Sequence, residues 1–494
     1  MFRLLLPDAV LAVAFSLGAD SPVPNYWCTW ATQGSRLGLS VSSGKLAFAG
    51  DQGRPGQRDN LNERVLFDAD GWAVAGWRDV RGDLYLMLDD GWDVPYGAQS
   101  VKGKGSPFGS CIPDARRFPS LAGSPSERLK ALNDRVRSLG WRGIAVWVAC
   151  QTPGETRERP YSDERSRAAW ADRMRISKAA GVDYWKVDWG IHAGSASYRE
   201  MMSQVRDQVH PKLRLEHCLC SWPLEDGARD TNRTDRILAA SDVFRTYDVL
   251  APLATATTLS RVAWFSSRAD SQSLRTLLNV EDRPIVAAAL GHLMGIMRSP
   301  AAPGMAPDVE VALAWQRIAP PFGHDRGLKT LVSESELVDA WHFESGSTWY
   351  KAVVGKTVEQ KAPASIVRGL PLPDVRAAGR MPFVCGARFP NGAMALALLP
   401  RTVDGHKRVP CPAAVTLEAR LEKGCPLALF GAFESVVLKR GLERGARVFA
   451  RALPGGSARD VTDCCQTDGT GSLVIPGSLL DASAACPHVV VEAR

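Results

Sequence analysis

Short apolar runs alternate with longer amphipathic segments along the first two-thirds of the chain. Between several of the runs, apolar residues recur at helical spacing, as in segments 126–140, 165–181 and 197–209. A strand followed by a helix, repeated about eight times, predicts a (β/α)8 TIM barrel over residues 22–328. The strand-like runs begin at or near Pro24, Asp83, Arg142, Val182, Leu213, Ser241, Thr276 and Gly295.

The pattern changes beyond residue 328, where alternating apolar runs are separated by Gly and Pro turns. This pattern predicts a C-terminal antiparallel β-sandwich domain over residues 329–494. The connection between the first two barrel runs, residues 33–81, is unusually long. It contains Gly and Ser turns and a predicted short helix around residues 60–67. We expect this insertion to cover the mouth of the barrel, because long connections in compact domains are usually functional.

The composition is that of a globular protein with two or three domains. Of the 494 residues, 45% are hydrophobic and 23% are charged. The formal net charge is only +7, and Lys and Arg are interspersed with Asp and Glu. A nucleic-acid partner and a membrane partner are therefore not expected. The sequence allows a homodimer.

The first 21 residues resemble a secretory signal peptide. One Arg precedes an apolar stretch, which Pro7 and Asp8 interrupt, and small residues follow at Gly18 and Ala19. Such a signal predicts a secreted, periplasmic or lysosomal protein. Six of the 11 Cys lie in the last third of the chain, which would suit disulfides formed in an oxidising compartment.

Polar residues follow the strand-like runs, where a barrel places the rim of its active site. They are Asp89, Asp90, Asp188, Ser221, Asp248 and Asp282. Retaining glycoside hydrolysis needs two carboxyl groups, roughly 5–5.5 Å apart, that converge on one pocket. Asp188 and Asp248 follow different runs, the fourth and the sixth, and are the predicted pair.

The neighbours of the two carboxylates suggest different roles. Lys186 lies two residues before Asp188 on the same strand face, and a nearby cation keeps a nucleophilic carboxylate ionised. A general acid needs a raised pKa, so we expect Arg245 to contact a sugar hydroxyl rather than Asp248. Asp242, at the start of the same run, is the alternative acid.

Other residues are candidates for sugar binding. Asp89 and Asp90 are adjacent carboxylates that can accept hydrogen bonds from neighbouring hydroxyls. The chain has 15 Trp, and their flat rings can stack on sugars. Trp30, Trp92 and Trp147 are the candidate stacking surfaces.

Four motifs occur in the order LDDGW, YWKVDWG, CSWP and FRTYD. Together they resemble the motifs of α-galactosidases and α-N-acetylgalactosaminidases, glycoside hydrolase family 27 and its relative family 36. The resemblance implies that Asp188 is the nucleophile and Asp248 the acid/base, and that Lys186 and Arg245 contact the sugar.

The same resemblance assigns CSWP, which contains Ser221 and Trp222, to the substituent at C2 of the sugar. The sequence departs from the family in several places. The Arg-to-Asp spacing in FRTYD is one residue shorter than usual, and Gly91 stands where many members have Cys. The fifth run can also be aligned so that Glu216 faces the pocket.

The sequence therefore predicts a retaining exo-glycosidase that releases a terminal α-galactose-type sugar from a carbohydrate and needs no cofactor or metal. Galactose, N-acetylgalactosamine and β-L-arabinopyranose remain open as the sugar. One alternative is a carbohydrate-binding protein on a barrel that has lost turnover. Another is an aldolase with Lys186 as a Schiff base, but the adjacent Asp188 opposes the lowered Lys pKa that this chemistry needs.

Overall fold

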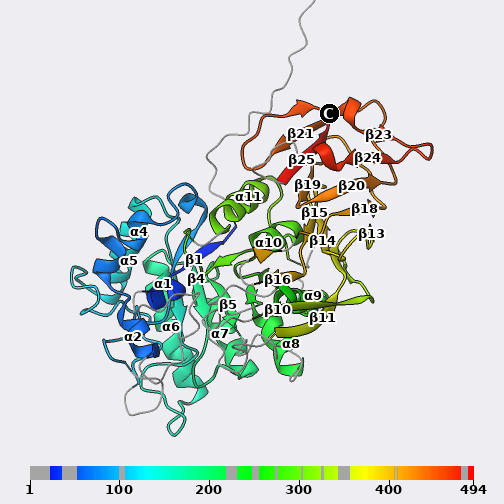
Figure 1. The fold of residues 1–494 in the computed structure, drawn as a ribbon. Helices are drawn as coiled ribbons and strands as arrows, with labels where there is room; N and C mark the ends of the chain where they lie inside the picture. Colours follow the sequence, from blue (N-terminus) through cyan, green and yellow to red (C-terminus); the bar gives the residue numbers. More distant parts are fainter. Residues whose placement is uncertain are drawn as a thin grey trace, which may run out of the picture.

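The first domain is a closed barrel of eight short parallel strands surrounded by helices (Figure 1). The computed structural model describes residues 23–35, 53–98, 106–218, 231–246, 255–272, 276–301, 304–323, 328–342, 357–404, 407–408, 410–479 and 488–494. The barrel strands are β1 (Tyr26–Cys28), β2 (Tyr85–Leu88), β3 (Ile144–Val148), β4 (Tyr184–Val187), β5 (Arg214–Cys218), β6 (Val243–Arg245), β7 (Leu277–Asn279) and β8 (Gly295–Ile296).

The strands pair in chain order from β1 to β7, and β8 pairs with β1. A parallel bridge between Asn279 and Leu293 joins the last two strands and completes the ring. Each strand lies within one of the eight predicted runs. The predicted (β/α)8 barrel is therefore confirmed.

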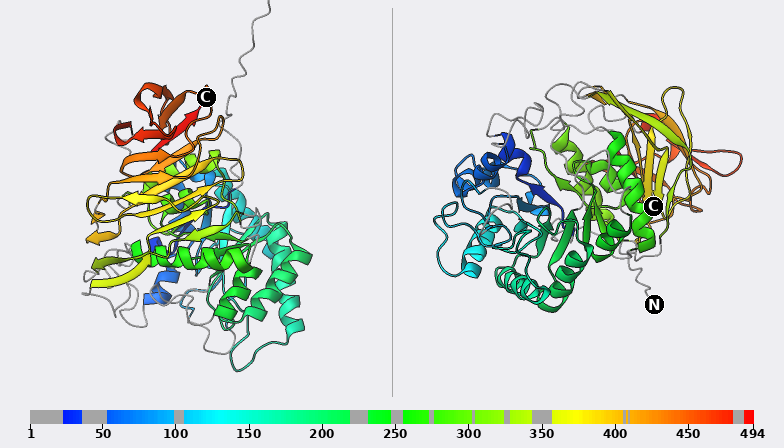
Figure 2. Two further views of the ribbon diagram at one scale, coloured as in Figure 1. Left: turned by 90° about the vertical axis from the view of Figure 1, so that its right-hand side faces the viewer. Right: turned by 90° about the horizontal axis from the view of Figure 1, so that it is seen from below.

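Seven helices of the described chain follow strands β2 to β8, and in the right-hand view of Figure 2 the helices surround the strands. They are α5 (Pro125–Ser138), α6 (Asp163–Ala179), α7 (Ala196–Val209), α8 (Thr231–Ala240), α9 (Thr255–Gln272), α10 (Pro284–Leu290) and α11 (Met305–Ile318). The three segments with helical periodicity form α5, α6 and α7. Ser124 and Glu127 form a capping box that starts α5, and the buried Leu129, Leu132 and Val136 turn one face of that helix inward.

The insertion between β1 and β2 is helical where the structure describes it. It contains α2 (Gly53–Asp59), α3 (Glu63–Phe67) and α4 (Trp72–Ala75), and it begins within α1 (Trp30–Ser35) and ends at the 3-10 helix η1 (Arg81–Asp83). The predicted short helix is α3, where Val65 N donates to Asn62 Oδ1 at 3.1 Å. Gln57 on α2 donates to Trp30 O at 2.8 Å. The insertion therefore lies against the carboxyl end of β1, at the mouth of the barrel.

The second domain is built from three β-sheets of the described chain. Its strands are β9 (Thr330–Val332), β10 (Glu336–His342), β11 (Thr357–Pro363), β12 (Ser365–Arg368), β13 (Asp374–Arg376), β14 (Phe383–Arg388), β15 (Met394–Leu399), β16 (Thr402–Asp404), β17 (Lys407–Arg408), β18 (Ala413–Leu417), β19 (Leu427–Phe430), β20 (Phe433–Leu438), β21 (Val448–Ala452), β22 (Arg459–Asp460), β23 (Gln466–Thr467), β24 (Leu473–Pro476) and β25 (His488–Ala493), with 3-10 helices η4 (Thr462–Cys464) and η5 (Gly477–Leu479).

An eight-stranded sheet, β22-β21-β25-β19-β15-β14-β12-β9, packs on a five-stranded sheet, β13-β18-β20-β24-β23. Apolar residues of both sheets form one buried core, which confirms the predicted β-sandwich. Most pairs are antiparallel, but β12–β14, β15–β19 and β18–β20 are parallel. One of the alternating apolar runs of the sequence, which begins at Ser347, lies outside the described residues.

The other face of the eight-stranded sheet packs on the barrel helices α10 and α11 (Figure 1). Trp315 on α11 contacts the rings of Phe389 and Phe430 edge to face, at centroid distances of 5.6 and 6.3 Å. Buried apolar residues of the barrel and of this sheet belong to one cluster. The interface between the domains therefore has the character of a hydrophobic core.

Two expectations concern the chain outside the barrel. The cysteines Cys28, Cys111, Cys150, Cys218, Cys385, Cys425, Cys464 and Cys465 are free thiols, so the disulfides expected in the C-terminal domain are not found among them. The candidate signal peptide lies outside the described residues. No helix in the described part of the chain is long and apolar enough to cross a bilayer.

Candidate active site

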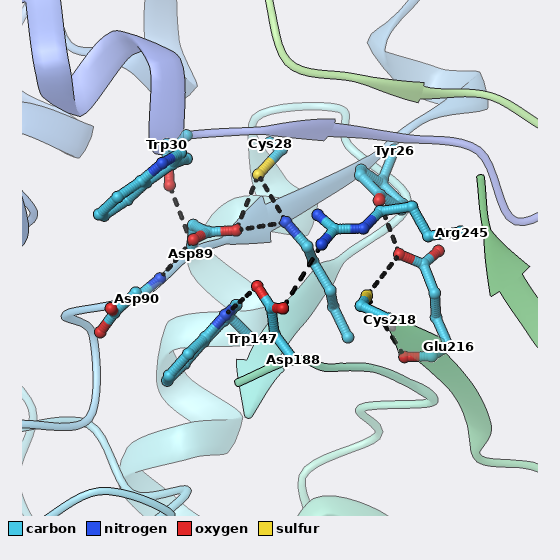
Figure 3. Close-up of polar contacts among 12 residues, drawn as sticks. Tyr26, Cys28, Trp30, Asp89, Asp90, Trp147, Asp188, Glu216, Cys218 and Arg245 are labelled. Atoms are coloured by element: carbon cyan, nitrogen blue, oxygen red, sulfur yellow. Dashed lines mark hydrogen bonds and ion pairs between the residues drawn. The ribbon is translucent and has the colours of Figure 1, made fainter. Parts of the chain in front are cut away.

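A buried ion pair crosses the mouth of the barrel between β2 and β4. Lys186 Nζ lies 2.8 Å from Asp89 Oδ2, and both side chains are at most 4% exposed. Cys28 Sγ, from β1, donates to the same Asp89 oxygen at 3.0 Å (Figure 3). Burial alone would lower the pKa of Lys186, but its anionic neighbours, Asp89 foremost, together outweigh burial and raise that pKa well above its usual value. The cationic form of Lys186 is therefore favoured, which argues against a Schiff-base role.

Asp188 follows β4 directly and is held by donors from two other strands (Figure 3). Trp147 Nε1 donates to Asp188 Oδ2 at 3.1 Å, and Arg245 Nη2 lies 3.4 Å from Asp188 Oδ1. Burial would raise the pKa of Asp188, but Arg245 and Lys186 prevail and lower it. The side chain remains 19% exposed. Asp188 is thus an oriented, ionised carboxylate that a ligand can reach.

Arg245 contacts a second carboxylate in addition to Asp188. Its Nη1 lies 3.3 Å from Glu281 Oε1, and both side chains are fully buried. Nearby in the barrel interior, Glu216 Oε1 accepts from the Tyr26 hydroxyl at 2.8 Å, and Oε2 accepts from Asn279 Nδ2 at 3.0 Å. Glu216 therefore supports the barrel interior in this structure and does not face the mouth.

Asp90 and Asp93 follow β2 and are also buried. Arg58 Nε, from the insertion, donates to Asp90 Oδ2 at 2.7 Å. Burial raises the pKa of Asp90 to about 6, although Arg58 opposes the rise. Burial also raises the pKa of Asp93 to about 7, against the hydrogen bond from Cys111 N. Carboxyl groups with very different protonation behaviour therefore lie around one mouth, as is common in catalytic sites.

The three candidate Trp residues have different positions. Trp147 is fully buried and donates to Asp188, and its ring lies 5.1 Å from that of Trp189. Trp92 is also fully buried, and its Nε1 donates to Trp147 O at 2.8 Å. Neither Trp92 nor Trp147 therefore presents a free ring face, and the prediction of both as stacking surfaces is corrected. Trp30 is partly exposed at the start of α1.

Asp242 lies at the wrong end of the barrel to be the acid. It precedes β6, so it is at the amino end of that strand, and its Oδ2 accepts from Leu215 N at 2.9 Å and pairs with Arg206. The active-site rim is at the carboxyl ends of the strands. The alternative assignment of the acid to Asp242 is therefore wrong.

Several predicted residues cannot be placed. Asp248, Ser221 and Trp222 lie outside the described residues. Asp282 is described and fully buried, and its Oδ1 accepts from Met297 N at 2.8 Å. Asp282 therefore joins the loops after β7 and β8. Within the described ranges, no group of three His, Cys, Asp or Glu side chains is arranged to hold a metal ion.

Sequence reasoning missed Arg58, Trp189 and Glu281. Trp189 could have been suspected because it follows Asp188 directly. Glu281 lies in a predicted run, two residues beyond the last residue of β7. Arg58 has no local signal, because only the path of the insertion brings it to Asp90.

No protein-family model matches the chain, and no curated protein matches it. Solved structures of glycosidases resemble it in fold. α-Galactosidase I from Mortierella vinacea matches 73% of this chain and 85% of its own, with 14% identity and a TM-score of 0.38. The α-galactosidase from Saccharomyces cerevisiae matches 96% of this chain and 98% of its own, with 10% identity and a TM-score of 0.43.

A family GH27 β-L-arabinopyranosidase from Geobacillus stearothermophilus, solved in complex with arabinose, covers 96% of this chain and 97% of its own. Its identity to this chain is 11% and the TM-score is 0.40. Similarity at these levels concerns the fold and does not transfer an activity. The chemistry of this chain has to be argued from its own residues.

Proposed function

We propose that this chain is a retaining glycoside hydrolase that removes a terminal α-galactose-type sugar, with Asp188 as its nucleophile. The observation that carries the proposal is the setting of Asp188 at the carboxyl end of β4. Trp147 and Arg245 orient its two oxygens, its pKa is lowered by Arg245 and Lys186 against the effect of burial, and its side chain is partly exposed. A retaining nucleophile needs these properties.

In the first step, an Asp188 oxygen attacks the anomeric carbon and forms a glycosyl ester while the glycosidic C–O bond breaks. The leaving oxygen needs a proton, which we assign to Asp248 from the sequence. In the second step, water attacks the anomeric carbon, its proton passes to Asp248, and the Asp188 carboxylate is released. The mechanism uses no metal or cofactor.

The remaining polar groups would hold the sugar. Asp89 and Asp90 can accept hydrogen bonds from hydroxyls, and Lys186 and Arg245 can donate them. The fixed dipoles and charges around Asp188 are arranged before substrate arrives, which is the main source of transition-state stabilisation in many enzymes. Trp30, Ser221 and Trp222 stay candidate contacts from the sequence.

The decisive experiment is hydrolysis of p-nitrophenyl α-galactoside, α-N-acetylgalactosaminide and β-L-arabinopyranoside. We expect turnover of at least one substrate, and a loss of roughly 10³-fold or more in Asp188→Asn because the attacking carboxylate is gone. Asp242→Asn, normalised to folded protein, should retain turnover because its carboxyl lies at the other end of the barrel.

Azide distinguishes the two carboxylates in this proposal. In Asp188→Ala, azide can occupy the place of the nucleophile and give a glycosyl azide of inverted configuration. In Asp248→Ala, azide should attack the glycosyl ester and give the retained configuration. NMR of the glycosyl azide shows whether its anomeric configuration is inverted or retained. A retained product from Asp188→Ala would contradict the assignment of Asp188 as the nucleophile.

The shortened Arg-to-Asp spacing in FRTYD favours a second candidate, a carbohydrate-binding protein on a barrel without turnover. Calorimetry with D-galactose, N-acetyl-D-galactosamine and L-arabinose separates the two. Binding of one sugar with no turnover of any glycoside would favour the binding protein. Export and dimerisation are further proposals from the sequence.

A further inference from the structure

Arg58 lies on α2 of the insertion and reaches into the barrel mouth. Its side chain is only 3% exposed, and Nε lies 2.7 Å from Asp90 Oδ2. Nη1 also donates to Ala98 O at 3.3 Å. The guanidinium lies 5.0 Å from the ring centroid of Phe108 and 5.3 Å from that of Trp189. The cation is therefore fixed by a carboxylate, a carbonyl and two aromatic rings.

The backbone at Arg58 is fixed as firmly as the side chain. Arg117 Nη1 donates to Arg58 O at 2.8 Å, and Arg117 Nη2 pairs with Asp59 at 2.7 Å. Gly91, next to Asp90, has φ +127°, and a Cβ there would lie 2.7 Å from Arg58 O. Only glycine allows this approach. The residue at position 91 and the path of the insertion are thus adapted to each other.

Asp90 connects Arg58 to the rest of the proposed sugar site. Asp90 N donates to Asp89 Oδ1 at 2.8 Å (Figure 3). Asp89 Oδ2 in turn pairs with Lys186. Asp90 is 2% exposed, and its Oδ1 has no hydrogen-bond partner among the described residues. Buried carboxylate oxygens normally have a donor. A sugar hydroxyl is a donor of this kind.

We propose that Arg58 is a positioning residue of the sugar site, which α2 delivers to fix Asp90 so that its Oδ1 accepts a hydrogen bond from a substrate hydroxyl. The inference rests on the proposed function. It assigns to the insertion a task in sugar binding that is more specific than covering the mouth.

The charge on Asp90 gives this role a measurable signature. Asp90 faces the cation Arg58 and the carboxylates Asp89 and Asp188, and Asp93 lies nearby. Burial brings the pKa of Asp90 to about 6, and the two carboxylates raise it while Arg58 lowers it. Removing Arg58 should raise this pKa further, by about 1–3 pH units. As the pH falls, a hydrogen bond that needs the carboxylate form of Asp90 would then be lost at a higher pH than in the wild type.

The test compares Arg58→Met and Arg58→Lys with the wild type between pH 5 and pH 8. The readouts are kcat/KM for the p-nitrophenyl glycoside that is turned over and calorimetric affinity for the matching free sugar. In Arg58→Met, the acidic limb of both profiles should move up by about 1–3 pH units, with the loss mainly in KM. Arg58→Lys should recover part of the shift.

Two further variants isolate the effect. Arg64→Met removes another Arg–Asp pair of the insertion, but its partners are 87% and 51% exposed, so both profiles should stay unchanged. In an Asp90→Asn background, Arg58→Met should cause no further shift of the acidic limb, because the titrating group is gone.

The outcomes separate the inference from the proposed function. If Arg58→Met lowers activity and affinity equally at all pH values and also lowers the Tm, Arg58 is only a structural anchor and the inference is wrong. Coincident profiles of Arg58→Met and the wild type overturn it too. A wild type that neither turns over nor binds any of the three sugars overturns both.

Discussion

Asp188 and Asp93 show how neighbours set protonation in one barrel mouth. Arg245 and Lys186 outweigh burial at Asp188 and lower its pKa, which favours the ionised form of this carboxyl. Asp93 accepts hydrogen bonds from Cys111 N at 2.9 Å and from Ser110, but burial outweighs them and raises its pKa to about 7. Asp93 can therefore take up a proton near neutral pH, whereas the neighbours of Asp188 favour its ionised form.

This difference predicts how stability depends on pH. The folded pKa of Asp93 is above its unfolded value, so the folded state binds more protons between about pH 4 and pH 7. The Asp93 contribution should therefore raise the free energy of unfolding as pH falls through this window. Asp93→Asn should remove up to about 1.4 kcal/mol per pH unit of that slope. Urea unfolding at a series of pH values measures it.

A matched variant controls for the lost charge. Asp68→Asn removes an exposed carboxylate that directly follows α3 and should leave the slope in this window unchanged. If the Asp93→Asn and wild-type curves run parallel from pH 4 to pH 7, Asp93 does not titrate there and the prediction fails.

At the scale of elements, the eight barrel strands and α5, α6 and α7 could be predicted because each has its own periodicity and its own cap or turn. The docking of α2 against the end of β2 could not. It depends on the close approach of Arg58 to Gly91, two residues that lie 33 positions apart and give no local pattern. The sequence shows that Gly91 differs from the family motif. Only the tertiary structure shows the reason, which is the close approach of Arg58 O.

The docking of α2 predicts a large effect of Gly91→Ala. The new Cβ would meet Arg58 O at 2.7 Å in a backbone conformation with φ +127°. We expect about 3 kcal/mol of destabilisation and a loss of activity as α2 is displaced. Urea unfolding and the glycoside assay measure the two effects.

Gly97→Ala is the matched control, since Gly97 has φ +72° but no atom within 4 Å of an added Cβ. It should cost only about 1 kcal/mol and leave turnover in place. Equal costs for the two variants would show that backbone strain alone, and not the contact with α2, makes glycine necessary at position 91.

At the scale of the whole molecule, the barrel and the sandwich are joined by polar contacts as well as by apolar packing. Arg368 on β12 is fully buried and donates to Leu290 O at 2.6 Å, at the end of α10, and to Phe322 O at 2.9 Å. Its guanidinium lies 3.9 Å from the Phe322 ring centroid. One side chain of the second domain therefore donates hydrogen bonds to backbone carbonyl oxygens of the first domain.

Because of this shared interface, the two domains should unfold in a single cooperative transition. Arg368→Met leaves carbonyls such as Leu290 O without their donor and should cost about 3 kcal/mol or more. Arg376→Met on β13, in an ion pair that is 83% and 60% exposed, should change stability by less than about 1 kcal/mol. Calorimetry checks both, and two separated transitions in the wild type would contradict the shared core.

The sequence by itself determined the barrel, the sandwich and the position of Asp188, because these depend on local periodicity and on residues that follow strands directly. Lys186 was also expected beside Asp188, but only the tertiary structure placed Arg245 there. It likewise decided that Asp93 is buried and that its pKa is raised. In the folded structure, Asp242 lies at the end of the barrel opposite to Asp188. Trp92 lies in the core, and Arg58 pairs with Asp90. The physical reason is that charge interactions and close packing depend on distances between strands and insertions that no pattern along the chain records.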